Sequence, residues 1–209
     1  MFAQLFLLKI VDNNKNGVRF HWNMPKGLKQ TSSPIQISTS SSIQNDPVAA
    51  QFTSKRIDLQ LNPLDNEVFV VTGLKIDFEN PVALVNSVAP AEFRVDQKIS
   101  VSTGTQTAFE GISSPQVIGA SAVDGQCSVQ AGPTFDYYIV HEQNAMDAPP
   151  ASMDYLHIIA TNDFYLNHLV SENYAAGQTM ACNVRLYGYR AVADASTYAA
   201  LVQSELLSA

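Results

Sequence analysis

The sequence predicts an all-β protein, an antiparallel β-sandwich of jelly-roll type with a short C-terminal helix. About ten segments of the 209-residue chain alternate apolar and polar residues, which is the period of strands with one buried and one solvated face. Apolar residues at helical spacing occur only near the C-terminus, so the strand–helix–strand units of a parallel sheet are not expected. No fixed repeat occurs, which disfavours propellers and solenoids. Two antiparallel sheets packed face to face fit this pattern best.

The chain is expected to begin with a hairpin. Phe2–Val11 and Val18–Trp22 are apolar runs separated by an Asn-rich tip that ends in Gly17. Thr31–Pro47 is rich in Ser and Thr, and we interpret it as a long surface loop that carries at most an edge strand. Gln51–Leu61 then alternates cleanly and predicts a half-buried strand.

The strongest strand is predicted at Glu67–Phe78, with Gly73 as a candidate β-bulge. Strict alternation over this segment divides its side chains between two faces. One face would hold Val68, Val70, Thr72, Leu74, Ile76 and Phe78, and the other would hold Phe69, Val71, Lys75 and Asp77.

The second half of the chain is expected to hold further strands at Phe93–Val101, Gln126–Gln130 and Phe135–Glu142. The small and polar residues of Ser113–Gly125 predict a loop. Tyr155–Thr161 and Phe164–Val170 are separated by Asn162 and Asp163, which predicts a hairpin with a two-residue turn.

The last thirty residues divide into two parts. Gln178–Ala193 alternates and predicts the closing strand, so residues 1–193 form the expected sandwich domain and residues 194–209 a helical tail. The apolar stripe of this tail is the candidate subunit interface, and its residues are Tyr198, Leu201, Val202 and Leu206. A helix of this length is marginal alone in water, so the stripe is expected to be buried against a neighbour or against its own sandwich.

Charge and cysteine content limit the classes of function. The net charge is −7, and the segment after Lys98 holds only two basic residues, Arg185 and Arg190. No basic arm is present to neutralise phosphates, so direct nucleic-acid binding is not expected. Cys127 and Cys182 are expected to be buried free thiols in a reducing compartment. Neither a signal peptide nor a membrane span is expected.

Catalytic, metal and cofactor sites are not expected. His21, His141, His157 and His168 never take the paired spacing of metal ligands. Phosphate-binding glycine loops and a Gly-x-Ser-x-Gly nucleophile motif are missing as well.

The enzymatic alternative is a glycosidase that uses the carboxylate of Asp77 or Glu79, which flank Phe78, and it ranks below a binding module. The Glu-x-Asp-x-x-Glu run and the nearby Trp platforms of sandwich glycosidases are missing, and Asn80-Pro81 follows directly. Solvated carboxylates at a turn are therefore the favoured interpretation.

Neighbouring aromatic residues leave two functions open. They are Tyr137 with Tyr138, Phe164 with Tyr165, and Tyr187 with Tyr189, and one of each pair is expected to face outward. Outward tyrosines serve either as sugar-stacking platforms or as subunit contacts, and we favour contacts.

Three segments together resemble the jelly-roll capsid proteins of icosahedral viruses. They are the strong strand Glu67–Phe78, the pair Tyr155–Thr161 with Phe164–Leu166, and the closing strand Val184–Arg190 with its tail. The resemblance implies a subunit that assembles with copies of itself into an icosahedral shell, in a virion assembled in the host cytoplasm. Other capsid proteins are a further candidate partner. Because it shows no basic arm, the chain resembles most closely the single-jelly-roll capsid proteins of viruses that enclose an internal membrane. The alternative is a receptor- or carbohydrate-binding sandwich of a fibre or spike head.

Overall fold

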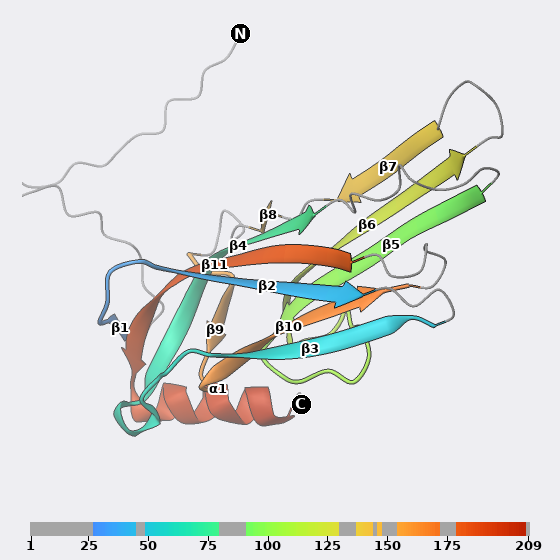
Figure 1. Ribbon diagram of the computed structural model, residues 1–209. Coiled ribbons are helices and arrows are strands. Elements are labelled where there is room, and N and C mark those ends of the chain that lie inside the picture. The colour runs from blue at the N-terminus through green and yellow to red at the C-terminus, as the bar shows by residue number, and fades with distance from the viewer. Residues whose placement is uncertain are drawn as a thin grey trace, which may run out of the picture.

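Two antiparallel sheets form the body of the protein in the computed structural model (Figure 1). The structure describes residues 27–44, 49–79, 91–129, 137–143, 146–147, 154–171 and 179–207, and it describes no side chains for 91–95, 125–129, 137–143 and 146–147. The hairpin predicted at Phe2–Trp22 lies outside these residues.

The first sheet, called sheet A, has β11 and β4 at its centre. Its strands are β1 (Leu28–Gln30), β2 (Ile35–Gln44), β4 (Glu67–Glu79), β8 (Met146–Asp147), β9 (His157–Ile159) and β11 (Thr179–Ala193). The second sheet, called sheet B, has the order β3-β10-β5-β6-β7. Its strands are β3 (Gln51–Asp58), β5 (Ala91–Ser102), β6 (Val117–Val129), β7 (Tyr137–Gln143) and β10 (Asp163–Val170).

The strands pair in a nested order that defines the jelly roll. β2 pairs with β11, β3 with β10, β4 with β9 and β5 with β6, all antiparallel. Early strands therefore pair with late ones, and the innermost pair is consecutive, as in a rolled-up hairpin of two Greek keys. The predicted fold class, an all-β jelly-roll sandwich with a short C-terminal helix, is confirmed.

The main core lies between the two sheets. Phe69, Leu74, Ile76 and Leu186 of sheet A and Ile99, Phe164 and Leu166 of sheet B are at most 1% exposed. Burial of a large apolar side chain contributes about 1.5–3 kcal/mol, so this layer supplies most of the stabilisation of the sandwich.

A β-bulge in β4 changes which face its side chains occupy. Tyr187 of β11 pairs with Gly73, but Gly188 pairs with Val71, so Thr72 has no partner across the ladder. Phe69 and Val71 therefore face the main core together with Leu74, Ile76 and Phe78. The strict alternation predicted for this strand is wrong before the bulge, because the unpaired residue places the side chains that precede it on the opposite face from the predicted one.

The displaced side chains need a second apolar layer. Val68 and Val70 point to the outer face of sheet A, where they cluster with Leu28, Ala160, Tyr189, Ala191 and Ala193. Helix α1 (Ala195–Leu207) packs over this cluster, and Figure 1 shows it at the end of the sandwich where β4 begins and β11 ends. The first half of β4 is thus covered on both faces.

The Ser-rich segment Thr31–Pro47, expected to be a loop with at most an edge strand, contains the ten-residue edge strand β2, whose many serines pair along β11. Two other predictions are corrected by the structure. The expected loop at Ser113–Gly125 contains most of β6, held between β5 and β7 although Gly, Ala and Ser have low strand propensity. The hairpin predicted around Asn162 is instead a crossover, because β9 lies in sheet A and β10 in sheet B.

Among the described residues, the helices are too short or too polar to cross a membrane.

Candidate functional site

The outer face of sheet A carries the features that bear on function, and α1 covers one end of it. Asp194 caps the helix: its Oδ1 accepts hydrogen bonds from the backbone N–H of Thr197 at 2.7 Å and from Ser196 Oγ at 2.8 Å. The bond from the Thr197 N–H is the main reason that the pKa of Asp194 is lowered. The cap is crowded, since a Cβ on Gly27 would lie 2.6 Å from Asp194 Oδ2.

Glu205 holds the last turn of α1. Its two carboxylate oxygens accept hydrogen bonds from the backbone N–H groups of Ala160 at 2.8 Å and Thr161 at 2.9 Å. Burial raises the pKa of Glu205, and these hydrogen bonds oppose that shift. The last turn of the helix is therefore fixed to the sandwich by the two hydrogen bonds of Glu205, and its start by the backbone hydrogen bond from the N–H of Asp194 to the carbonyl oxygen of Gly27 at 2.9 Å.

The four predicted interface residues do not lie together. Tyr198, Leu201 and Val202 pack half-buried against the outer apolar cluster of their own chain. Leu206 is 65% exposed and its neighbour Leu207 is 77% exposed. Three of the four side chains are therefore buried against the chain's own sandwich, which was one of the two expectations. That the helix forms a subunit interface stays a prediction.

Two further aliphatic side chains are exposed at turns. Leu64 lies in the 3-10 helix η1 (Pro63–Asp65) and is 91% exposed, and Ile112 in the β5–β6 connection is 78% exposed. Neither contributes to a core, so both are available for contact with another molecule.

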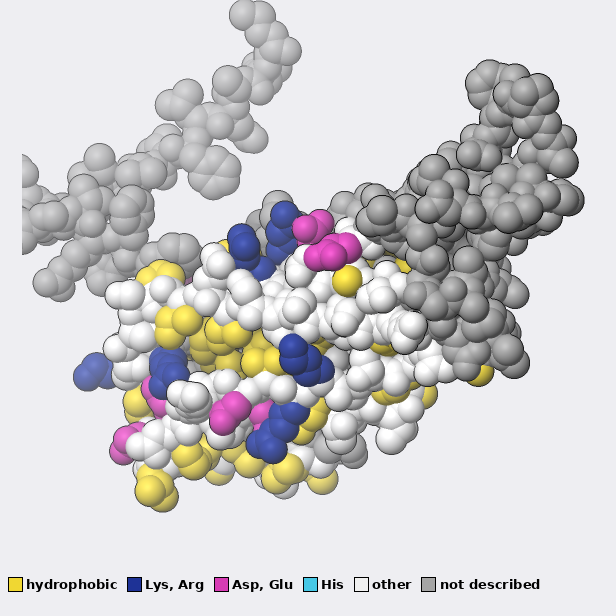
Figure 2. All heavy atoms as spheres, in the orientation of Figure 1, with side chains coloured by type: hydrophobic (Ala, Val, Ile, Leu, Met, Phe, Trp, Pro, Cys, Tyr) yellow, Lys and Arg dark blue, Asp and Glu magenta, His cyan; other side chains and the backbone are white. Residues whose placement is uncertain are grey.

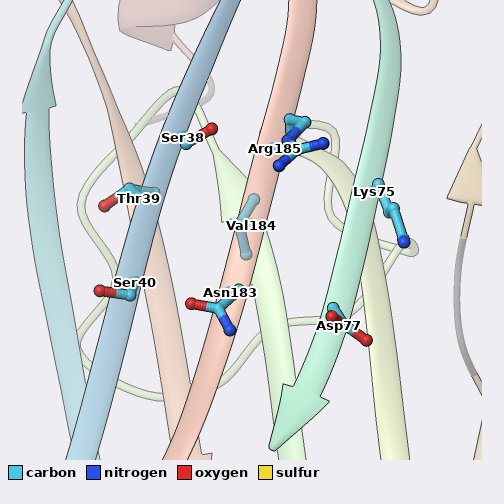
Figure 3. Close-up of a pocket in the computed structure, with 8 residues that line it drawn as sticks. All are labelled: Ser38, Thr39, Ser40, Lys75, Asp77, Asn183, Val184 and Arg185. Carbon is cyan, nitrogen blue, oxygen red and sulfur yellow. The ribbon is translucent and has the colours of Figure 1, made fainter.

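The polar half of the same outer face, away from α1, is hollowed into a shallow groove. The groove has a volume of about 360 Å³ and crosses β2, β11 and β4. Figure 3 shows its lining residues, which are Ser38, Thr39, Ser40, Lys75, Asp77, Asn183, Val184 and Arg185. Strand alternation places Ser38, Ser40, Lys75, Asp77, Asn183 and Arg185 on the opposite face from Leu74, Ile76 and Leu186. Thr39 and Val184 pair across the ladder and lie on the side of the main core.

Asp77 lines this groove near the end of β4, and Glu79 ends the strand beside it. Both are exposed, and Glu79 Oε1 accepts a hydrogen bond from Asn183 Nδ2 at 2.7 Å. The two carboxylates were expected at a turn, but they lie within a strand, because β4 continues through Glu79. Their side chains share one face of a regular strand.

Lys75 and Arg185 are directly opposite each other in the β4–β11 pairing. In Figure 2, basic and acidic side chains gather next to one another at the upper edge of the surface, over the region of β4 in Figure 1. These two basic residues were missed as site residues, because their adjacency depends on the register of strands more than a hundred residues apart. Glu205 was missed because a single acid near a C-terminus carries no pattern.

A buried polar cluster joins the two sheets beneath the groove. His168 Nε2 lies 3.0 Å from Gln97 Nε2, which also donates to the carbonyl oxygen of Ala181 at 3.0 Å. Gln97 can act only as a donor here, so His168 accepts at Nε2 and donates from Nδ1 to Ser41 Oγ, 3.1 Å away. Burial lowers the pKa of His168 to about 4.

Cys182 lies in the same cluster, with its sulfur 4.0 Å from His168 Nδ1. It is a buried free thiol, as predicted, and burial raises its pKa to about 12. The cluster is closed to solvent, which indicates a structural role in fixing the two sheets. In the part of the chain that the structure describes, no group of His, Cys, Asp and Glu is arranged to hold a metal ion.

The aromatic pairs divide as follows. Phe164 is fully buried while Tyr165 faces outward and is half-buried, and Tyr187 is half-buried beside the groove. Tyr189 is buried under α1. The side chains of Tyr137, Tyr138 and His141 lie outside those that the structure describes.

Neither a protein-family model nor a curated protein sequence matches this chain. The chain is similar in structure to VP1 of Trichodysplasia spinulosa-associated polyomavirus, with 7% identity over 82% of this chain and 98% of that one, at a TM-score of 0.34. It is also similar to a protein of Desmodium yellow mottle tymovirus, with 10% identity over 94% of this chain and all of that one, at a TM-score of 0.26. Both come from viruses. At these TM-scores neither likeness carries an argument about this chain.

Proposed function

We propose that this chain is a structural subunit of a viral capsid that assembles with copies of itself into an icosahedral shell. The nested strand order is that of the jelly roll, an architecture used by viral capsid and lectin domains. The observation that carries self-assembly is the exposure of Leu206 and Leu207 at the end of a helix that is otherwise docked. Exposed neighbouring leucines are disfavoured in water and are relieved by contact with another subunit.

The open side of the sandwich supports the same proposal. The edge strands β2 and β3 lie side by side there, and Figure 2 shows hydrophobic side chains between them. Ile35, Ile37 and Ile57 are only partly buried against the main core. Lys55 Nζ donates to the carbonyl oxygen of Ser40 at 2.8 Å, which blocks part of the free edge against uncontrolled strand pairing.

This proposal places the protein in the virion, assembled in the host cytoplasm, with copies of itself as the first partner and other capsid proteins as the next. The buried free thiol of Cys182 is compatible with a reducing compartment. Contact through the exterior of α1 also leaves the sandwich unchanged, because neither Leu206 nor Leu207 belongs to a core.

The test compares the full chain with the double variant Leu206→Ser, Leu207→Ser by light scattering and electron microscopy. We expect oligomers or particles for the full chain, loss of the largest species for the double variant, and equal thermal stability. Gln203→Ala, an exposed change on the same helix, is the control and should assemble normally. A full chain that stays monomeric at the highest soluble concentration contradicts the proposal.

A further inference from the structure

Charges on the polar half of sheet A are sorted along the strands. Lys75 of β4 and Arg185 of β11 face each other across the ladder. Asp77 and Glu79 follow two and four residues further along β4 on the same face. The face therefore has a basic end and an acidic end, and the groove crosses it from β2 over β11 to β4.

The basic end lacks neutralising partners. Like charges directly opposite each other destabilise a sheet, and Lys75 and Arg185 form no ion pair with any described residue. Three other basic residues of the sandwich have an acidic partner: Arg56 with Asp163, Lys98 with Asp96 at 3.4 Å, and Arg190 with Glu67 at 3.5 Å. Lys75 and Arg185 differ from these three because they are unpaired and lie directly opposite each other, so acidic groups of a partner would stabilise them.

The acidic end offers acceptors for basic side chains. The Asp77 carboxylate and the hydroxyl of Ser40 line the groove at this end, since both residues lie opposite Asn183. Asn183 donates its Nδ2 to Glu79, which leaves its amide oxygen as an acceptor, on the side of β2 in Figure 3. The groove is shallow and polar, and it suits the long side chain of a lysine or an arginine.

We propose that this face docks on the same face of a second copy of the chain. The two-fold axis lies in the plane of contact and runs across the strands, between the level of Lys75 and that of Glu79. This rotation reverses the strand direction, so Lys75 and Arg185 of each copy meet Asp77 and Glu79 of the other. The inference rests on the proposed self-assembly and names one of its contacts. α1 rises over the other half of the face and limits the contact to the polar half.

Sign reversal tests the docking in the full chain. Lys75→Glu with Arg185→Glu makes the face wholly acidic, and Asp77→Lys with Glu79→Lys makes it wholly basic. Each double variant should weaken the dimer by about tenfold or more, because like charges then meet. The quadruple variant reverses the polarity and keeps the net charge, so it should dimerise like the unchanged chain. Sedimentation at low and high salt measures the affinities, and salt should weaken the dimer.

Circular dichroism checks that every variant is folded. If a double variant unfolds, Lys75→Gln with Arg185→Gln replaces it and must also weaken the dimer. A quadruple variant that dimerises as poorly as the doubles overturns the docking. Sulfate binding that is lost in the quadruple variant, with dimerisation unchanged throughout, identifies a small-anion site instead and also overturns it.

The two proposals fail separately. Double variants that form particles as readily as the unchanged chain overturn the docking and leave the capsid function in place. A salt-sensitive dimer that never grows into larger species supports the docking and contradicts the capsid function.

Discussion

Glu205 and Ala160 are joined by a hydrogen bond of 2.8 Å, from the backbone N–H of Ala160 to the carboxylate of Glu205. The bond ties the last turn of α1 to the point where the chain leaves sheet A for sheet B. The helix has no fully buried residue, so its position depends on this anchor, on the cap at Asp194 and on three half-buried side chains.

Replacing Glu205 by Ala should loosen the helix without dissolving the sandwich. The change leaves the N–H groups of Ala160 and Thr161 without their acceptors, and such buried donors cost about 1–3 kcal/mol. We expect a lower urea midpoint and faster hydrogen exchange at these two amides. Gln203→Ala should change neither, and unchanged exchange at Ala160 in the Glu205 variant would contradict the anchoring role.

Gly188 should not tolerate a side chain. A Cβ there would lie 2.5 Å from Cε1 of Phe69 and would overlap the carbonyl oxygen of Val70, next to the bulge in β4. Gly188→Ala is expected to lower the free energy of unfolding by about 1–3 kcal/mol, because backbone and core must shift. Gly111→Ala is the matched control, since no atom lies within 4 Å of its Cβ, and it should be neutral. Equal stability of the two variants would contradict this prediction.

Stability should fall in acid because of His168. Above pH 6.5 the His168 ring is neutral in both the folded and the unfolded protein, and its full contribution to the free energy of unfolding is present. Between pH 6.5 and about 4 only the unfolded state binds the proton, so stability falls by about 1.4 kcal/mol per pH unit, or about 3 kcal/mol in all. A protonated ring would also turn a second donor towards Gln97.

The variant His168→Gln isolates this contribution. The lowered pKa of His157 acts in the same direction, while the raised pKa of Glu205 acts in the opposite one, and both remain in the variant. Denaturant unfolding between pH 4 and pH 7 should show a flatter profile for His168→Gln than for the unchanged chain. Parallel profiles would contradict the assignment.

Cys182 should resist alkylation in the folded protein. Its thiol is fully buried, and its pKa of about 12 leaves almost no thiolate at neutral pH. Iodoacetamide followed by peptide mass mapping should label Cys182 only after denaturation, and the mapping separates it from Cys127. Labelling of Cys182 under native conditions would show that the cluster around His168 opens.

Periodicity predicted the strands wherever one face is buried and the other solvated. Gln51–Leu61 and Gln178–Ala193 were recognised because their alternation is clean, and the structure has β3 and β11 there. Periodicity did not predict most of β6, because its small residues, held between two strands, show no alternation of apolar and polar side chains. At β2 it indicated at most an edge strand within a loop, and the ten-residue length of this strand comes from pairing with β11 and hardly from its own composition.

The candidate site was less accessible from the sequence than the fold. The stripe Tyr198, Leu201, Val202 and Leu206 was recognised as apolar, but spacing does not tell which surface receives it. The structure divides it, with three side chains on the chain's own cluster and Leu206 exposed. The charged face needs the β4–β11 register, which links residues far apart in the chain.

The sequence by itself determined the all-β class, the strong central strands and the terminal helix, because these depend on local periodicity. Tertiary structure alone decided the rest. One unpaired residue, Thr72, turns Val68 and Val70 outward and so creates the apolar surface that α1 covers. Strand register sets Lys75 beside Arg185, and the crossover after β9 presents the N–H groups that Glu205 accepts. Such relationships arise from pairing between distant segments, whose free energy depends on the whole sandwich and on no single stretch of chain.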